Sequence, residues 1–398
     1  MSKFAHSSAR ATTPPAGPPW LPAAHDRLWV DRRWLIVTFA LTAAALSFFG
    51  WRALLNIAIA GGAATIVHAL IAWGVRAALP QRRLDSTWHA LALGALLGLC
   101  LPPLAAPWFV AIAGAALGAI AHVVGRAHPL RVHPVALVMS ATLLLAGAAP
   151  FLEHGLLPET APILRPNRLI VGNLHDAPTA PDWPTTLDPW WHTAAGAGEG
   201  DTVLRPVPAR TFLVEAPRYL TEPATFSEAV RSRRLPSLAA VVLGAAPGAV
   251  GATSVGLLLV MGLWLMYERL ARPGTALAAV FGAAVAVCAM PVMIGETWTW
   301  ALGELVVMSA PMAVLFIAHV LLASLLPMIV LVLAPEGQPM SAAGRLVYGL
   351  LIGAGAVAAM WWFERPEGAY LALGMAGLLA RPLDALRREQ FKSASSTD

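Results

Sequence analysis

The sequence predicts an all-α polytopic membrane protein, with about ten transmembrane helices, some of them short or broken, and one long extracytoplasmic loop. Hydrophobic residues make up 58% of the chain and charged residues only 12%, whereas a soluble globular protein carries about 25% charged residues. The charges gather in short clusters between long apolar runs. Because this pattern leaves little charge for a surface in water, we expect the outer surface to face lipid.

Ten apolar runs are candidates for membrane spans. A helix that rises about 1.5 Å per residue needs about 20 residues to cross about 30 Å of hydrocarbon. The candidate spans are residues 34–51, 53–75, 87–102, 106–125, 134–151, 251–270, 275–295, 309–333, 345–363 and 368–383. Pro102, Pro103 and Pro107 interrupt the third and fourth runs, so we expect some of the runs to be half-helices or tilted hairpins.

Basic residues give these ten spans one consistent orientation. Clusters lie before the first and ninth spans and after the second, fourth, sixth and tenth, with Arg32, Arg82, Arg126, Arg272, Arg345 and Arg387 as examples. With ten spans, all these positions face one side, which the positive-inside rule assigns to the cytoplasm. We therefore predict a multi-pass protein of the bacterial inner (cytoplasmic) membrane with both termini in the cytoplasm. Since the basic residues mark span ends, we expect no nucleic-acid partner.

The predicted organisation has five parts. A disordered cytoplasmic tail is followed by an N-terminal membrane bundle of about five helices, a Pro-rich extracytoplasmic loop, a second bundle of about five helices and a cytoplasmic tail, at residues 1–30, 31–151, 152–236, 237–385 and 386–398. The long loop contains Trp183, Trp190 and Trp191. It is either an irregular loop or a cap that lies on the membrane surface.

Three histidines fall inside predicted spans: His68, His122 and His319. An ionisable residue at membrane depth is costly to bury unpaired, so each is a candidate for a proton or ion path. The alternative is a neutral histidine hydrogen-bonded between helices. No two of them have a telling spacing within one helix, which does not favour haem.

Other site chemistry is absent from the sequence pattern. The cysteines Cys100 and Cys288 lie inside apolar runs and form no CxxC pair, so we predict small apolar residues there rather than cluster ligands or a disulfide. No Ser-His-Asp arrangement, HExxH motif or metal-ligand cluster is evident. We therefore assign no catalytic residue and no metal.

Three stretches, in order, carry a resemblance to one family. The first is Asp85-Ser86 followed by LALGALLGLCLPPLAAPWFVAIAGAALGAIAH; the second is LGAAPGAVGATS at 243–254; the third is GRLVYGLLIG at 344–353, followed by Pro382-Leu383-Asp384. Together they resemble the RnfD/NqrB family, whose members are RnfD of the Rnf electron-transport complex and NqrB of the sodium-translocating NADH:quinone reductase. This chain would be a divergent member.

The resemblance implies a membrane subunit of a redox-driven, ion-translocating complex. In that family the protein positions flavin and passes electrons between partner subunits, coupled to Na⁺ or H⁺ transport. The chain would work with other membrane and redox subunits, because it contains no NADH-binding or cluster-binding motif. The alternative is a cofactor-free membrane scaffold or small-solute transporter that has lost the flavin chemistry.

The family carries flavin mononucleotide (FMN) as a phosphoester on the threonine of a Ser-Gly-Ala-Thr motif. The matching residues here are Glu222-Pro223-Ala224-Thr225, so the resemblance makes Thr225 the covalent FMN position. The departures disfavour covalent attachment: Pro223 removes an N–H, and Glu222 adds negative charge where a phosphate must arrive. FMN or riboflavin held without a covalent bond is the alternative. The glycine-rich stretch adds three cofactor-binding candidates: Gly248, Gly251 and Thr253. A glycine-rich loop before a helix can bind a phosphate, whereas the resemblance favours close packing of a turn there.

Two further family motifs are eroded. The loop at 125–135 has lost both asparagines of the family's Gly-Gly-Leu-Gly-x-Asn-x-Phe-Asn-Pro-Ala. The family's Asp-Pro-Val-Thr-Ser-Pro becomes Ala-Pro-Glu-Gly-Gln-Pro at 334–339, which loses the aspartate and gains Glu336 two positions later. Glu336 thus joins the three histidines as a candidate for an ion or proton path.

Overall fold

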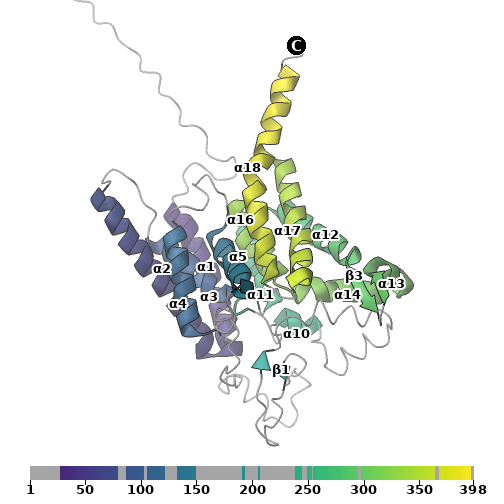
Figure 1. The fold of residues 1–398 in the computed structure, drawn as a ribbon, viewed down its shortest axis with the longest axis horizontal. Coiled ribbons are helices and arrows are strands. Elements are labelled where there is room, and N and C mark those ends of the chain that lie inside the picture. The colour runs from purple at the N-terminus through teal and green to yellow at the C-terminus, as the bar shows by residue number, and fades with distance from the viewer. Residues whose placement is uncertain are drawn as a thin grey trace, which may run out of the picture.

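The computed structural model describes residues 27–78, 87–102, 105–121, 132–148, 191–192, 205–206, 238–243, 249–252, 254–294, 297–363 and 367–395. Most of these residues are helical (Figure 1). The predicted N-terminal tail, apart from its last few residues, and most of the predicted long loop lie outside the described residues.

Of the first five helices, α1 to α4 gather on one side of the molecule, and α5 lies at its centre beside α18 (Figure 1). They are α1 (Arg27–Phe49), α2 (Trp51–Ala78), α3 (Thr87–Cys100), α4 (Pro107–Ile120) and α5 (Pro134–Ala148). Proline opens α4 and α5, where its fixed φ suits the first turn and its missing N–H costs nothing. Each helix overlaps one predicted span, so the sequence located these helices correctly.

Within the predicted long loop, β1 (Trp191–His192) pairs antiparallel with β2 (Arg205–Pro206). A second antiparallel pair, β3 (Pro291–Ile294) with β4 (Thr297–Trp300), follows α12. The predicted span 275–295 is therefore helical only to Cys288, after which the chain turns into this hairpin. The all-α prediction is right for the bundle and misses these two short ladders.

The C-terminal half has more breaks than the N-terminal half. Its helices are α10 (Leu238–Leu243), α11 (Val255–Tyr267), α12 (Pro273–Cys288), α13 (Ala301–Val307), α14 (Ala310–Leu322), α15 (Leu326–Met328), the π-helix η3 (Ile329–Leu333), α16 (Ala334–Gly337), α17 (Ala342–Phe363) and α18 (Gly368–Ser395). The helices α17 and α18 stand side by side, and α18 projects beyond the rest of the bundle (Figure 1). Leu326 to Gly337 form one continuous helical path, a π-helix between two short α-helices, and every residue in it except Glu336 is buried.

Two described helices are long and apolar enough to cross a bilayer on their own, in the ranges Ala53–Val75 and Ala342–Phe363. A third span results if Ala310–Leu322 and Leu326–Gly337 are counted together, although these two pieces are bent by 62°. Five further apolar helices are shorter than a full span. The chain is thus a helical membrane protein, and the count of ten spans stays a prediction.

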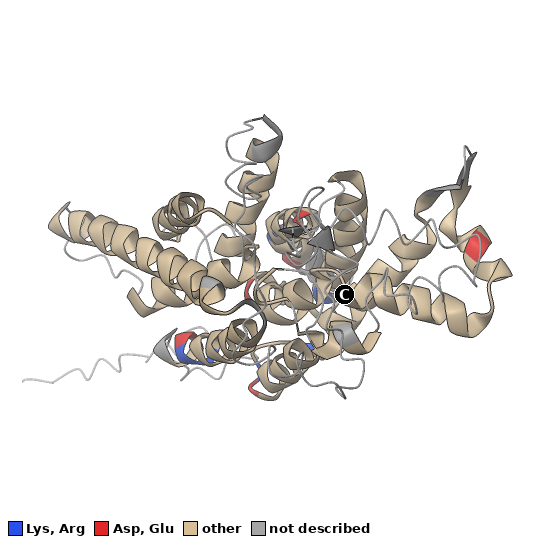
Figure 2. Cartoon of the chain, turned by 90° about the horizontal axis from the view of Figure 1, so that it is seen from below, with Lys and Arg blue, Asp and Glu red and all other residues tan. Residues whose placement is uncertain are grey.

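The outer surface of the bundle is apolar. Phe39 on α1 is 76% exposed and Trp73 on α2 is 75% exposed, and Phe281 on α12 also points outward. Lysine, arginine, aspartate and glutamate, drawn blue and red in Figure 2, occupy only a few turns of the described helices. Large apolar side chains in such number on the surface suit a solvent of lipid tails rather than water.

Small residues allow the helices to approach closely in both halves. On α4, a Cβ added at Gly118 would lie 2.3 Å from the carbonyl oxygen of Ala64 on α2. On α17, a Cβ added at Gly353 would lie 1.8 Å from the carbonyl oxygen of Ala279 on α12. Lipid offers no hydrophobic drive between helices, so this backbone-to-backbone packing supplies much of the attraction.

The substitution Gly353→Ala should separate α17 from α12. Its new methyl group meets backbone, which cannot move away cheaply, so we expect a loss of about 1–3 kcal/mol in stability. Unfolding of the purified protein in detergent measures it. The matched control is Gly62→Ala on α2, where an added Cβ meets nothing within 4 Å; it should leave stability equal or raise it by up to about 1 kcal/mol. Equal losses in both variants would contradict the close α12–α17 packing.

Candidate functional site

The helix α3 stops inside the bundle, at Cys100, because Pro102 and Pro103 follow. The last carbonyls of a helix have no partner within the helix. Here the segment after α10 supplies two donors: the Gly251 N–H donates to the Leu99 oxygen at 2.7 Å, and the Val250 N–H donates to the Leu101 oxygen at 3.1 Å. A loop from the second half of the chain thereby donates hydrogen bonds to carbonyls at the end of a helix in the first half.

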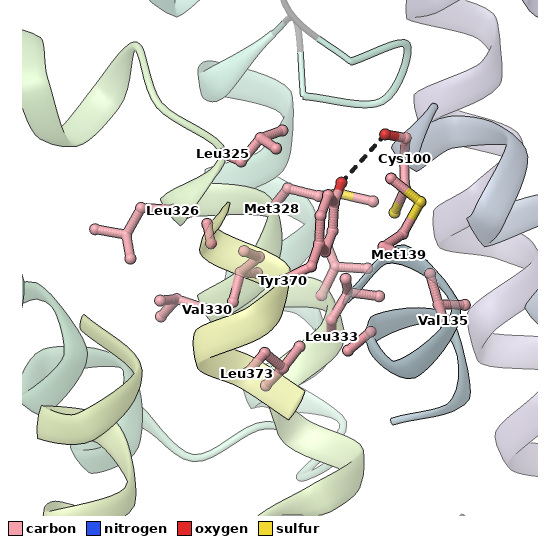
Figure 3. Packing of buried hydrophobic residues seen from close by; sticks show 14 of the residues in the cluster. Cys100, Val135, Met139, Leu325, Leu326, Met328, Val330, Leu333, Tyr370 and Leu373 are labelled. Carbon is pink, nitrogen blue, oxygen red and sulfur yellow. Dashed lines mark hydrogen bonds between the residues drawn. The ribbon is translucent and has the colours of Figure 1, made fainter. Parts of the chain in front are cut away.

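Side chains satisfy the two remaining carbonyls at this break. The Tyr370 hydroxyl on α18 donates to the Cys100 oxygen at 3.2 Å, as Figure 3 shows. The Asn56 side-chain amide on α2 donates to the Pro102 oxygen at 3.0 Å. Tyr370 is fully buried, so its phenol reaches this carbonyl across the packed interior. All four carbonyls from Leu99 to Pro102 therefore have protein donors.

These contacts give Gly251 a structural role at the end of α3. Its N–H is already bound to Leu99, and a Cβ added at Gly251 would lie 2.8 Å from the Leu99 Cβ. The residue closes the α3 break and does not present a free N–H to a phosphate. The other predicted cofactor positions, Thr225, Gly248 and Thr253, lie outside the described residues.

The chain from α14 to α16 contains the second break. Between α14 and α15, the Ser324 hydroxyl donates to the Leu321 oxygen at 3.1 Å and accepts from the Leu326 N–H at 3.3 Å. This side chain replaces backbone hydrogen bonds at the 62° bend. Downstream, the π-helix η3 is buried along its whole length, and π-turns inside helices often accompany functional sites.

The end of this second broken helix is also completed by side chains. The Tyr348 hydroxyl on α17 lies 3.5 Å from the Ala334 oxygen, and the Gln338 amide donates to the Pro335 oxygen at 3.2 Å. Gln338 is held in turn by the Thr275 hydroxyl of α12, which donates to it at 3.1 Å. Each broken helix thus ends against a buried tyrosine.

Glu336 extends from this helix end to His133, the residue before α5. The His133 Nε2 and Glu336 Oε2 atoms are 3.2 Å apart, and the two side chains are 0% and 12% exposed. The two atoms do not form a hydrogen bond, so the pair is a close electrostatic contact. The Val135 N–H donates to His133 Nδ1 at 3.2 Å, which leaves the ring proton of a neutral imidazole on Nε2.

A second histidine–carboxylate pair lies nearby. His89 on α3 and Asp31 on α1 approach to 2.9 Å between Nδ1 and Oδ1, with side-chain exposures of 25% and 4%. Burial lowers the pKa of His133, the Glu336 charge opposes that shift, and the charge of His89 adds to it. We call Asp31, His89, His133 and Glu336 the histidine–carboxylate cluster. On the predicted threading, all four residues lie at cytoplasmic ends of spans.

The sequence identified Glu336 and missed its partner. His133 lies one residue outside the predicted fifth span, and only histidines inside spans were considered as proton or ion path residues.

Of the three histidines predicted for such a path, His319 is buried with its Nδ1 3.0 Å from the Leu315 oxygen of its own helix, and His68 is buried on α2. His122 lies outside the described residues. In the part of the chain that the structure describes, no three His, Cys, Asp or Glu residues are grouped to hold a metal ion.

Asp384, in the Pro382-Leu383-Asp384 stretch, has a structural role. Its carboxylate accepts from the Met340 N–H at 2.8 Å and from the Ser341 N–H at 3.0 Å. These groups precede the first turn of α17, where free N–H groups and the helix dipole favour negative charge. Asp384 therefore joins α18 to the start of α17.

A sequence model described as the NQR2, RnfD, RnfE family matches residues 19–392. This range includes both broken helices and the whole histidine–carboxylate cluster. A search of curated proteins finds no match.

The substitution Tyr370→Phe removes the donor to the Cys100 oxygen and leaves the packing nearly intact. We expect a loss of about 0.5–1.5 kcal/mol in unfolding free energy, because a buried carbonyl loses its partner. The control Tyr267→Phe alters a tyrosine that is 82% exposed and should change stability little. Denaturant unfolding in detergent compares the two, and equal stability of both variants would show that the Tyr370 bond contributes nothing.

Proposed function

Since the chain belongs to the NQR2, RnfD, RnfE family, we propose that it is a membrane subunit of an Rnf/Nqr-type electron-transport complex. The family match over residues 19–392 carries the proposal, because it spans nearly all of the described helices. The apolar exterior supports it further, since a subunit of such a complex lies in the bilayer.

Within that complex, the proposed task is to position a flavin and to pass electrons between partner subunits, coupled to Na⁺ or H⁺ transport. Flavin supplies the electron-carrying chemistry, and the protein supplies binding and orientation. Thr225 is the proposed covalent FMN position. Gly248, Gly251 and Thr253 are the other proposed cofactor-binding residues. The Gly251 N–H donates to the Leu99 oxygen, so a contact at Gly251 would not use this N–H.

The proposed location is the inner membrane, with both termini in the cytoplasm. The support comes from the clusters of arginines at span ends, which on a ten-span threading face one side and leave Arg52 on the other. On this threading the histidine–carboxylate cluster lies near the cytoplasmic surface. The proposed partners are the other membrane and redox subunits, which would deliver and accept the electrons.

A cofactor-free scaffold or small-solute transporter is the second candidate. One observation favours it: at Gly251, a glycine of the stretch predicted to bind a cofactor, the N–H closes the α3 break instead. The altered Glu222-Pro223-Ala224-Thr225 stretch points the same way.

Purification of the full chain, expressed together with its neighbouring genes, tests the proposed function. We expect a yellow protein that co-purifies with redox subunits. Covalent FMN at Thr225 gives flavin fluorescence that survives denaturing electrophoresis and disappears in Thr225→Ala. The matched control is Thr221→Ala, four residues earlier in the same stretch, which should keep the fluorescence.

The remaining outcomes separate the candidates. Yellow colour that is lost on denaturation shows flavin held without a covalent bond, and it keeps the redox proposal. A colourless protein that associates with no redox subunit refutes the proposal and leaves the scaffold or transporter.

A further inference from the structure

The helices α12 and α17 lie side by side and begin at the same end of the bundle. A Cβ added at Gly349 of α17 would collide with the Thr275 oxygen of α12. One turn later, a Cβ added at Gly353 would collide with the Ala279 oxygen, one turn later on α12. Since the contacts advance along both helices in the same direction, α12 and α17 are parallel, and their N-termini are neighbours.

This arrangement brings three arginines together. Arg272 is the residue before α12, Arg345 lies in the first turn of α17, and Arg269 lies in the turn between α11 and α12. Burial lowers the pKa of Arg272, and the positive charges of Arg345 and Arg269 lower it further. The three guanidinium groups therefore lie close enough to repel one another. We call them the three-arginine group.

Two carboxylates lie near this group, and both have other partners. Glu268 pairs with Arg33 of α1, with 3.3 Å between Oε2 and Nε. The charge of Asp384 acts on Arg345, but its oxygens also accept two backbone N–H groups before α17. At Arg272, both of the charges that shift the pKa are positive. An anion bound between the arginines would turn this repulsion into attraction.

Arg269 has a backbone conformation that usually belongs to glycine. Its φ is 59°, and beside it the Leu270 N–H donates to the Leu265 oxygen at 2.9 Å in the turn that ends α11. Helices commonly end in this way with glycine at the left-handed position, because a Cβ is strained there. An arginine at this position costs stability, so its exposed guanidinium is a candidate for a binding role.

Exposed apolar side chains follow the arginines along both helices. Leu277 and Phe281, four residues apart on one face of α12, are 69% and 64% exposed, and Leu351 of α17 is also exposed. Guanidinium groups bind phosphate oxygens through paired N–H donors. Positive charge at the end of a span, next to an apolar surface, matches a phospholipid, in which a phosphate is attached to acyl chains. A free anion or an acidic protein would match the charge alone.

We propose that Arg269, Arg272 and Arg345 bind the phosphate group of an anionic phospholipid, whose acyl chains lie along the exposed faces of α12 and α17. The bound lipid joins the α11–α12 turn to the start of α17. On the proposed threading this end of the bundle is cytoplasmic, so the lipid belongs to the inner leaflet. The inference goes beyond the proposed function, and it depends on neither flavin nor a redox partner.

Native mass spectrometry of the full-length protein, released from detergent micelles, tests the site. The probe is phosphatidylglycerol, which is anionic, and the comparison is phosphatidylcholine, which contains the same phosphate but has no net charge. We expect one tightly bound phosphatidylglycerol that phosphatidylcholine does not replace. Each arginine near a lipid surface contributes about fivefold to binding, so the double variant Arg272→Gln, Arg345→Gln should bind about 25-fold more weakly. The control Arg52→Gln, at the start of α2, should bind as the wild type does.

The variant Arg269→Gly separates binding from folding. Glycine suits the left-handed conformation, so the melting temperature of the lipid-free variant should equal or exceed that of the wild type. Its affinity for phosphatidylglycerol should nevertheless fall about fivefold. If the affinity is unchanged in this variant, Arg269 binds no lipid and the proposal is wrong.

Other outcomes also overturn the proposal. Equal retention of the two lipids by the wild type does so, and this comparison requires no variant to fold. Inorganic phosphate that displaces the lipid more effectively than sodium chloride of equal ionic strength would show a site for free phosphate instead. If the wild type binds no phosphatidylglycerol and the arginine variants lose co-purifying redox subunits, the arginines contact an acidic surface of a partner.

Failure of this inference is distinguishable from failure of the proposed function. The lipid measurement uses neither flavin nor partner subunits. A colourless protein that associates with no redox subunit and still retains phosphatidylglycerol would refute the redox proposal and keep the lipid site.

Discussion

The structure depends on one constraint: every backbone carbonyl in a bilayer interior must find a donor within the protein. A continuous helix meets this constraint along its length, and a broken helix does not. This chain breaks two helices and then completes their ends with further donors. Tyr370 and Gly251 donate at the end of α3, and Tyr348 of α17 and the adjacent Gln338 donate at the end of α16. The donors for α3 come from the second half of the chain, so the two bundles are joined by hydrogen bonds in places where either alone would be incomplete.

Close packing makes these bonds reachable. Glycines at the α2–α4 and α12–α17 contacts bring backbones together, and the shorter helices then pack around these pairs. The same compactness surrounds the histidine–carboxylate cluster. His133 and Glu336 meet because α5 begins, and the broken helix ends, at the same level of the bundle.

The sequence predicted the parts of this fold that depend on local chemistry. Pro102 and Pro103 indicated the end of α3, apolar runs located most of the helices, and Glu336 stood out as a carboxylate at a span end. What it missed depends on contacts between distant residues. Nothing local indicates that Tyr370 binds the Cys100 oxygen or that Gly251 packs on Leu99, and the conformation after Cys288 is a hairpin although the sequence there is apolar enough to continue a helix. His133 was missed because it lies one residue before the fifth span, outside both the predicted span and α5, and only histidines inside the predicted spans were considered.

The bond between Tyr370 and Cys100 joins residues 270 positions apart, and this separation has a consequence for biogenesis. The ribosome delivers α3 to the membrane long before the last helix exists. Throughout that interval the Cys100 carbonyl has to be hydrated, or shielded by the insertion machinery, since its eventual donor has not been synthesised. The N-terminal bundle is therefore an assembly intermediate, and the native arrangement of its interior is completed only when the C-terminal end of the polypeptide arrives.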